Sequence, residues 1–248
     1  MRRFGLLGYP LKHSFSPAYF NAKFDRENIK NTKYELFEFS NLSDFSQYLL
    51  NNNDIEGFNV TIPYKEQILT FLTEVDEWAL KIGAVNCVKV LENQENQLRL
   101  KGYNTDAQAF EETLLVGWNL PDKALIFGTG GAAKAVTAVL QKHHVDYLLV
   151  SRHRQGNKVI KYEDLSNQIL KERKLWINAT PVGMYPQCEQ MLSVNDKMLT
   201  EEHFVYDLIY NPEETLLLKA GKKYGSQVKN GLPMLHRQAE LSWQIWNR

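Results

Sequence analysis

The sequence lacks the features that mark secreted, membrane-spanning and metal-dependent small proteins. Only two of its 248 residues are cysteine, Cys87 and Cys188, and no Cys-x-x-Cys pair occurs, so we expect neither a disulfide framework nor a metal site. It has no uninterrupted run of 18 apolar residues, which a membrane-spanning helix would need. Such low cysteine content is typical of the reducing cytoplasm, and we expect the protein there.

An excess of either charge is also missing. The 29 Lys and Arg residues balance 29 Asp and Glu residues, so the formal net charge is zero. Proteins that bind nucleic acids or membrane surfaces by charge usually carry a basic excess. We therefore expect neither partner, although a balanced total leaves room for a local basic patch.

The composition that is present is that of an ordinary globular protein, with 44% hydrophobic and 23% charged residues. Short apolar runs alternate with amphipathic stretches, which is typical of an α/β fold. We expect two α/β domains, with the boundary between Thr105 and Pro121. The pattern does not decide whether the last helix, from Leu232 to Trp246, returns to the first domain.

The expected elements follow from strand-length runs, caps and glycines. In the first domain, Ser16 should cap a helix with Pro17 at its first position, and Pro63 should begin a helix that carries Lys65. The other expected elements here are strands at 3–9, 33–39 and 57–62, a helix at 74–82, and a hairpin of 84–91 with 97–102. This sheet should be mostly parallel with an antiparallel edge. In the second domain we expect strands at 124–127, 147–150, 175–179 and 205–209, and helices at 130–142, 163–173, 213–224 and 232–246.

A glycine-rich turn stands where a Rossmann domain binds a dinucleotide. The strand 124–127 runs into Gly128-Thr129-Gly130-Gly131-Ala132-Ala133, and a helix follows. Gly128 permits the tight turn, Gly130 lets the backbone approach a pyrophosphate, and Ala133 allows the helix to pack closely on the strand. The register of strand, turn and helix favours a dinucleotide site; a glycine-rich turn without a ligand is the alternative.

The residues after the next strand decide which dinucleotide fits. NAD sites usually place Asp or Glu there to bind the ribose 2′-hydroxyl, but this chain has Ser151-Arg152-His153-Arg154. Because a guanidinium pairs bidentately with a phosphate, we predict NADP, with Arg152 on its 2′-phosphate. Either Arg154 or Lys158 would add a second charge. The alternative is a solvated basic turn.

Polar side chains gather after the strands of the first domain, at Ser14, Ser16, Asn59, Thr61, Lys65, Asn86, Asn104 and Asp106. Crevices outside strand ends are where such folds bind ligands, and this set suits a small, hydroxylated, anionic substrate. Taken singly, each residue has a common structural role as a cap, a turn residue or a solvated lysine.

These residues belong to a longer pattern that resembles the shikimate dehydrogenase family. The matching segments are 8–17 (GYPLKHSFSP), 57–65 (GFNVTIPYK), 83–86 (GAVN), 102–106 (GYNTD), the glycine turn, 178–184 (NATPVGM), 206–212 (YDLIYNP) and 231–235 (GLPML) with Gln238. They follow one another in the family's order along nearly the whole chain. Together they are far more specific than the glycine turn alone.

The resemblance implies the reversible, NADPH-dependent reduction of 3-dehydroshikimate to shikimate, within chorismate and aromatic amino acid biosynthesis. It implies an N-terminal α/β substrate domain at 1–106 with a mixed, mostly parallel sheet, joined by the C-terminal helix 232–248. A Rossmann-type NADP-binding domain would occupy 107–231. The sequence leaves the oligomeric state open, a homodimer included.

The resemblance also implies roles for single residues. Ser14 and Ser16 would hold the substrate carboxylate, and Lys65 and Asp106 would be the catalytic pair. The ring hydroxyls would fall to Thr61, Asn86, Asp106 and Gln238, with Asn59 in the same site and Tyr210 nearby. The cofactor contacts would be Gly128, Thr129, Gly130, Gly131, Ala132, Ser151, Arg152, His153, Arg154, Thr180, Leu208, Gly231 and Glu77.

This chain departs from the family pattern at one place. The family often reads Asn-Arg-Thr where this chain has Ser151-Arg152-His153, and the family's second basic residue falls near Gly156 here. The key arginine is kept, whereas the second phosphate contact must come from Arg154 or Lys158, or cofactor affinity drops.

The expected chemistry needs one proton beside the hydride. Lys65, as an ammonium, would stabilise the charge that develops on the C3 oxygen and donate the proton, while Asp106 would keep the lysine charged and oriented. A quinate/shikimate dehydrogenase, often NAD-using, is the nearest alternative and would favour an acid in place of Ser151-Arg152. A catalytically silent NADP-sensing protein is another, which loss of Lys65 or Asp106 would indicate; both are present.

Overall fold

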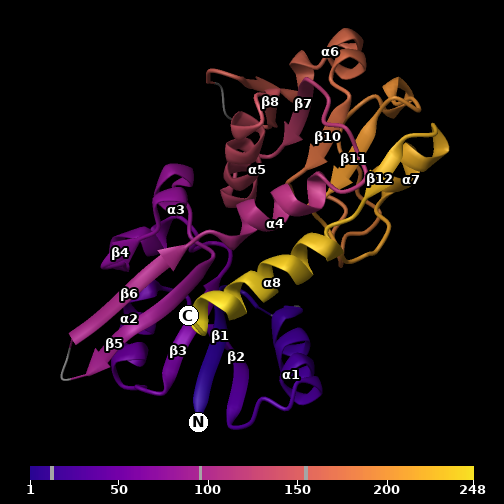
Figure 1. Cartoon of the computed structure of the whole chain (residues 1–248). Helices are drawn as coiled ribbons and strands as arrows, with labels where there is room; N and C mark the ends of the chain where they lie inside the picture. Colours follow the sequence, from indigo (N-terminus) through magenta and orange to yellow (C-terminus); the bar gives the residue numbers. More distant parts are fainter. Residues whose placement is uncertain (12–13, 95–96, 154–155) are drawn as a thin grey trace. The chain divides into compact units, whose positions relative to one another are not determined.

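The computed structural model describes residues 1–11, 14–94, 97–153 and 156–248, and it folds as two units (Figure 1). Met1–Thr105 and Gln238–Arg248 form the first unit, and Asp106–Arg237 form the second. Each unit is built on a six-stranded sheet. The last helix, α8 (Leu232–Trp246), contributes residues to both units.

The first sheet has the strand order β2-β1-β3-β5-β6-β4. Its strands are β1 (Arg2–Gly8), β2 (Thr32–Glu38), β3 (Ile55–Val60), β4 (Glu74–Val75), β5 (Cys87–Gln94) and β6 (Gln97–Tyr103). β1 pairs in parallel with β2 and β3, and β4 with β6, whereas β5 is antiparallel to both its neighbours. The sheet is mixed, as predicted, but the antiparallel strand lies inside it; the expected antiparallel edge was wrong.

The helices of the first unit are α1 (Ser16–Arg26), α2 (Leu42–Leu50), the 3₁₀ helix Gln67–Phe71 and α3 (Glu77–Ile82). Three further expectations about this unit were wrong. Phe15, not Ser16, is the N-cap of α1. No helix begins at Pro63: Tyr64 N–H bonds to the Thr61 carbonyl at 2.9 Å and closes a turn over residues 61–64, and Lys65 follows this turn. The expected helix 74–82 begins only at Glu77, because Glu74 and Val75 pair with β6.

An aromatic cluster packs the end of α8 against the first sheet. Trp246 stacks on Phe4 with ring centroids 4.8 Å apart, and its indole N–H donates to the Val88 carbonyl at 2.9 Å. Phe20 and Tyr34 stack beside it at 4.4 Å. Gly57 is required under this ring, because a Cβ there would lie 2.4 Å from Trp246. The last helix is therefore part of the core of the first unit.

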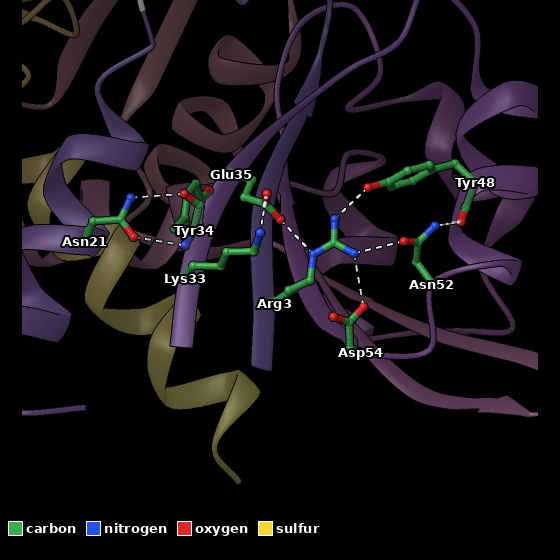
Figure 2. Close-up of polar contacts among 8 residues, drawn as sticks. All are labelled: Arg3, Asn21, Lys33, Tyr34, Glu35, Tyr48, Asn52 and Asp54. Atoms are coloured by element: carbon green, nitrogen blue, oxygen red, sulfur yellow. Dashed lines mark hydrogen bonds and ion pairs between the residues drawn. The ribbon is translucent and has the colours of Figure 1, made fainter. Parts of the chain in front are cut away.

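A polar network fastens the start of β1, at the end of the strand away from Gly8 (Figure 2). The Arg3 guanidinium donates to Glu35 at 2.7 Å, to Tyr48 at 2.6 Å and to Asp54 at 3.1 Å. Burial raises the pKa of Glu35, but hydrogen bonds from Lys33 and Arg3 outweigh it, so that pKa is lowered. The network joins β1 to β2, to α2 and to the residues before β3.

The second sheet is parallel between all its strands, in the order β12-β11-β10-β7-β8-β9. Its strands are β7 (Lys123–Phe127), β8 (Asp146–Ser151), β9 (Val159–Lys161), β10 (Leu175–Asn178), β11 (Phe204–Asp207) and β12 (Gln227–Lys229). The edge strands β9 and β12 were not predicted, since three residues carry too little periodicity to be recognised. Buried apolar side chains on one face of this sheet form a core cluster, which includes Leu125, Phe127, Trp176, Val205 and Leu217.

The helices of the second unit are α4 (Thr105–Leu114), α5 (Gly131–Lys142), α6 (Asn167–Glu172) and α7 (Leu216–Lys223), with short 3₁₀ helices at Tyr162–Asp164 and Asp196–Met198. The helices expected at 163–173 and 213–224 begin later than predicted. Ser166 caps α6 and Thr215 caps α7 through their side-chain oxygens. Over the described ranges, no helix combines the length and apolar character needed to cross a membrane.

Candidate active site

The register of the first sheet brings the predicted polar residues to one edge of the sheet, the edge formed by the ends of its strands. β1, β3 and β6 end there and β5 starts there, because Asn59 pairs with Cys87 and Cys87 pairs with Tyr103. Thr61, Asn86 and Asn104 each lie one or two residues beyond this row. The segment after β1, which contains Ser14 and Ser16, leaves from the same edge.

Asn59 holds this edge together from inside. Its side chain is 4% exposed and accepts a hydrogen bond from the Tyr34 hydroxyl at 2.8 Å. Its amide group donates to the Asn86 carbonyl at 3.1 Å and to the Ser242 hydroxyl at 2.8 Å. Asn59 therefore joins β2, the start of β5 and α8 within a single buried side chain.

Asn86 fixes the start of α4. Its side-chain oxygen accepts the Thr105 backbone N–H at 2.7 Å, and its amide donates to the Thr105 hydroxyl at 2.9 Å. Asp106 follows directly in the first turn of α4, where a carboxylate is favoured by the helix dipole, and it is 7% exposed. Asn86 thus fixes the position of Thr105, the residue directly before Asp106.

The other predicted substrate residues of the first unit are half-buried: Ser14, Ser16, Thr61, Lys65 and Gln238. The side chains of Ser16 and Tyr34 are hydrogen bonded. Lys65 is held through its backbone, whose carbonyl accepts the Val85 N–H at 2.7 Å. The Gln238 backbone carbonyl accepts a hydrogen bond from the Ser242 hydroxyl at 2.9 Å, one helical turn away. Ser242 in turn accepts from the Asn59 amide, so two hydrogen bonds link Gln238 to Asn59.

The glycine turn of the second unit has the shape that a pyrophosphate requires. Gly128 has φ of +109°, and a Cβ there would lie 2.9 Å from the Ala179 carbonyl oxygen. Gly130 is the N-cap of α5 and offers no side chain to its first turn. A Cβ on Gly130 would meet no described atom within 4 Å, so the space before the helix is open. The backbone N–H groups of Gly131 and Ala132 begin α5 at this opening, which fits an anion.

The basic residues after β8 do not all point the same way. Arg152 and His153 are exposed just beyond Ser151, whose hydroxyl accepts the His153 N–H at 3.4 Å. Lys158 instead pairs with Asp146 at 3.2 Å and lies over the Tyr147 ring. Asp146 begins β8 whereas Ser151 ends it, so the Lys158 ammonium is directed away from Arg152. Arg154 lies outside the described residues.

Three predicted cofactor residues follow β10, β11 and β12. Thr180 donates from its hydroxyl to the Asn178 side chain at 2.7 Å. Leu208 N–H bonds to the Asn178 carbonyl at 3.0 Å. A Cβ on Gly231 would lie 2.0 Å from the Leu208 carbonyl oxygen, so Gly231 packs directly on Leu208.

Two residues that sequence reasoning left without a role close these strands. Asn178 ends β10 and Asp207 ends β11, and both are fully buried. Burial raises the pKa of Asp207 to about 6, against hydrogen bonds from Thr215, Ile209 and Asn178 that lower it. The signal was present in the sequence as a polar residue closing each apolar strand, within the quoted segments 178–184 and 206–212.

The remaining predicted residues are Tyr210, which is half-buried three residues beyond β11, and Glu77, which is exposed at the start of α3 in the first unit. Within the described part of the chain, no three His, Cys, Asp or Glu side chains lie together as a metal site requires.

Comparison with known proteins identifies the family. Residues 6–88 match the model of the shikimate dehydrogenase substrate binding domain. A shikimate dehydrogenase (NADP(+)) of Caldanaerobacter subterraneus subsp. tengcongensis is 38% identical over 261 residues, covering 98% of this chain and 90% of the relative. The chain belongs to the shikimate dehydrogenase family.

Solved structures agree with this assignment. Shikimate 5-dehydrogenase from Thermus thermophilus, in complex with NADP(H) and shikimate, has a TM-score of 0.84 at 32% identity, covering 99% of this chain and 93% of that one. Quinate dehydrogenase from Corynebacterium glutamicum, in complex with NAD, has a TM-score of 0.85 at 26% identity with the same coverage. The family confirms the predicted α/β fold class, the oxidoreductase activity on a CH–OH group, and NADP as cofactor.

Proposed function

We propose that this chain reduces 3-dehydroshikimate to shikimate with NADPH, and oxidises shikimate in the reverse direction, within chorismate and aromatic amino acid biosynthesis. The observation that carries the proposal is the similarity over 98% of the chain to a relative named shikimate dehydrogenase (NADP(+)). The retention of Lys65 and Asp106 argues against a catalytically silent member of the family.

We assign the substrate to the first unit and NADP to the second. The match of residues 6–88 to a substrate binding domain supports the first assignment. The open space at Gly130, at the start of α5, supports the second. The returning part of α8 then belongs with the substrate-binding unit.

In the proposed reaction NADPH supplies a hydride to the C3 carbonyl carbon, and the protein supplies a proton to the carbonyl oxygen. Lys65 stabilises the charge that develops on this oxygen and donates the proton as the C–H bond forms. Asp106 is the second member of the proposed catalytic pair. The new hydroxyl and oxidised cofactor complete the balance, and Lys65 regains its proton from solvent.

The substrate is proposed to be held by groups that the edge of the first sheet presents. Ser14 and Ser16 bind the carboxylate. The ring hydroxyls fall to Thr61, Asn86, Asp106 and Gln238, and Tyr210 is proposed as a further contact. The buried contacts of Asn59 with Tyr34, Asn86 and Ser242 support a role for Asn59 in holding this site in shape.

The cofactor is proposed to lie along the ends of the second sheet. The backbone of residues 128–132 receives the pyrophosphate, and Ser151, Arg152 and His153 receive the adenosine 2′-phosphate. The pairing of Lys158 with Asp146 argues against Lys158 as the second phosphate contact. Thr180, Leu208 and Gly231 are proposed for the nicotinamide end, and Glu77 is proposed as a further cofactor contact.

A quinate activity is the second candidate, because the quinate dehydrogenase structure has a TM-score of 0.85. Arg152, where NAD sites carry an acid, disfavours NAD. Absorbance at the reduced nicotinamide band, followed with shikimate or quinate and with NADP⁺ or NAD⁺, tests both proposals. We expect the shikimate and NADP⁺ pair to be fastest; a faster reaction of quinate with NAD⁺ would overturn the assignment.

We propose a cytoplasmic enzyme and a homodimer. Cys87 and Cys188 are not joined by a disulfide, which supports a reducing compartment. The edge strand β2 exposes Leu36, which supports self-association. Sedimentation of the wild-type chain and of Leu36→Lys tests the homodimer, and a monomeric wild-type chain would contradict it. No nucleic-acid partner is proposed for this electrically balanced chain.

A further inference from the structure

The ends of β10 and β11 are joined by one buried pair of polar side chains. The Asn178 amide donates to the Asp207 carboxylate at 3.0 Å. In the sheet register these two residues are direct neighbours. Both residues are 0% exposed, next to a core cluster of apolar side chains. A buried carboxylate needs such partners, because burying it without them would be costly.

Each member of the pair also holds the loop that follows its own strand. Asn178 accepts the Thr180 N–H at 3.0 Å and the Thr180 hydroxyl at 2.7 Å, and that hydroxyl accepts the Val182 N–H at 3.2 Å. Asp207 accepts the Ile209 N–H at 3.0 Å and the Thr215 hydroxyl at 2.7 Å. The pair therefore couples the loop after β10 to the loop after β11 and to the start of α7.

The residues held in this way are those proposed for one end of the cofactor. Thr180 is bonded to Asn178 directly. Leu208 lies between Asp207 and Ile209, and Gly231 bonds through its N–H to the Ile209 carbonyl at 2.9 Å. The adenosine end is elsewhere, because Ser151 and Arg152 follow β8, which is separated from β10 by β7.

We propose that Asn178 and Asp207 are positioning residues for the nicotinamide end of the cofactor site: together they fix the loops that carry Thr180, Leu208 and Gly231. The inference rests on the proposed NADP site and goes beyond it. Neither residue is proposed to touch the substrate or to move a proton. The pair acts by keeping two loops in a single arrangement before the cofactor arrives.

The experiment compares two ligands by calorimetric titration of the full chain: NADP⁺, and adenosine 2′,5′-bisphosphate, which lacks the nicotinamide end. Asp207→Ala removes the acceptor of three hydrogen bonds, and we expect it to weaken NADP⁺ binding on the order of 10-fold or more. Binding of adenosine 2′,5′-bisphosphate should stay within about threefold of wild type, since the β8 end is untouched.

A conservative variant and a matched control separate positioning from general loss of stability. In Asp207→Asn the amide oxygen can still accept from Asn178 and Ile209, while its N–H₂ donates to Thr215, so NADP⁺ affinity should largely recover. Leu170→Ala opens the apolar core of the same unit at α6, away from both loops. It should lower the melting temperature without changing the affinity for NADP⁺.

Asn178→Ala cuts the same link from the other strand and carries the test if Asp207→Ala does not fold. Equal weakening of both ligands by these variants, unchanged NADP⁺ affinity, or weakening by Leu170→Ala as well would overturn the inference. Failure of the proposed NADP site would give a different result, because the wild-type chain itself would then bind neither ligand.

Discussion

The side-chain amide of Asn59 donates to the hydroxyl of Ser242 at 2.8 Å, although the two residues are 183 positions apart in the sequence. This bond connects β3 to α8 inside the first unit. Ser242 also lies 3.3 Å from the Thr105 hydroxyl, just before Asp106. The last helix thus completes the contacts around Thr105, which precedes the Asp106 proposed as catalytic.

Ser242→Ala is expected to lower the free energy of unfolding by about 1–3 kcal/mol, because it leaves the buried Asn59 amide without that acceptor and removes the contact with the Thr105 hydroxyl. Urea denaturation followed by tryptophan fluorescence measures the change. The exposed Ser43→Ala serves as control and should shift the midpoint little. Equal midpoints for the two variants would contradict the importance of the Asn59 contact.

Lys65→Met is expected to lower kcat on the order of 10²-fold, the scale of general acid–base catalysis, while KM for shikimate changes less. Steady-state kinetics with NADP⁺ and shikimate give both constants. The exposed Lys30→Met should leave them unchanged. A turnover near that of wild type in Lys65→Met would remove this lysine from the reaction.

Arg152→Gln is expected to weaken NADP⁺ binding about 10- to 100-fold and to leave NAD⁺ binding nearly constant. Only NADP⁺ carries the 2′-phosphate that the Arg152 guanidinium is proposed to bind. Lys158→Gln is the matched comparison. Since Lys158 pairs with Asp146, its loss should change the ratio of the two affinities less than about twofold. Fluorescence titrations with both dinucleotides decide; a large effect of Lys158→Gln would reassign the second phosphate contact.

Gly130→Ala is expected to leave the fold intact and to impair cofactor binding. The added Cβ would meet no described atom within 4 Å, and φ of −82° suits alanine. A pyrophosphate approaching that backbone would meet the new methyl group. We expect a melting temperature within about 2 °C of wild type and NADP⁺ affinity lower by about 10-fold or more. Undiminished affinity would place the pyrophosphate away from Gly130.

The Asp207 carboxyl predicts a particular pH dependence of stability. Its pKa is about 6 in the folded chain against an ordinary value of 3.8, so the folded chain holds this proton more tightly than the unfolded one. The free energy of unfolding should therefore fall as the pH rises from about 4 through about 6. The gap between the two pKa values corresponds to about 3 kcal/mol, lost by about pH 8.

Asp207→Asn, which cannot titrate, is the reference for this effect. The difference in unfolding free energy between wild type and variant should move in favour of the variant between about pH 4.5 and about pH 8, measured by urea denaturation at each pH. Because other titrating groups are common to both chains, they cancel in the difference. Parallel profiles for the two chains would show that Asp207 keeps an ordinary pKa.

Local chemistry explains what the sequence predicted well. The turn at Gly128 and Gly130 follows from backbone geometry that only a few neighbouring residues determine. The same holds for Gly83, whose φ of +71° ends α3 as expected. The longer strands of both sheets were recognisable because their apolar runs have strand length and clear boundaries.

Distant partners explain what the sequence did not predict. Ser16 does not cap α1, and its side chain is hydrogen bonded to that of Tyr34, which lies on β2. The sequence offered Lys158 as a phosphate ligand, yet its ammonium forms an ion pair with Asp146 at the other end of β8. The pairing of Asn178 with Asp207 depends on the sheet order, which no local pattern contains.

The two-part composition of the first unit has a consequence for the order of events during synthesis. Residues 1–105 leave the ribosome first, but the aromatic rings and the hydroxyl that complete their core arrive only with Gln238–Arg248. At ordinary rates of translation the delay is on the order of ten seconds. The nascent N-terminal segment must wait with an incomplete apolar surface while the whole inserted unit is made. Chaperone binding to the nascent chain should therefore concentrate on this segment, and the second unit should acquire its structure before the first unit does.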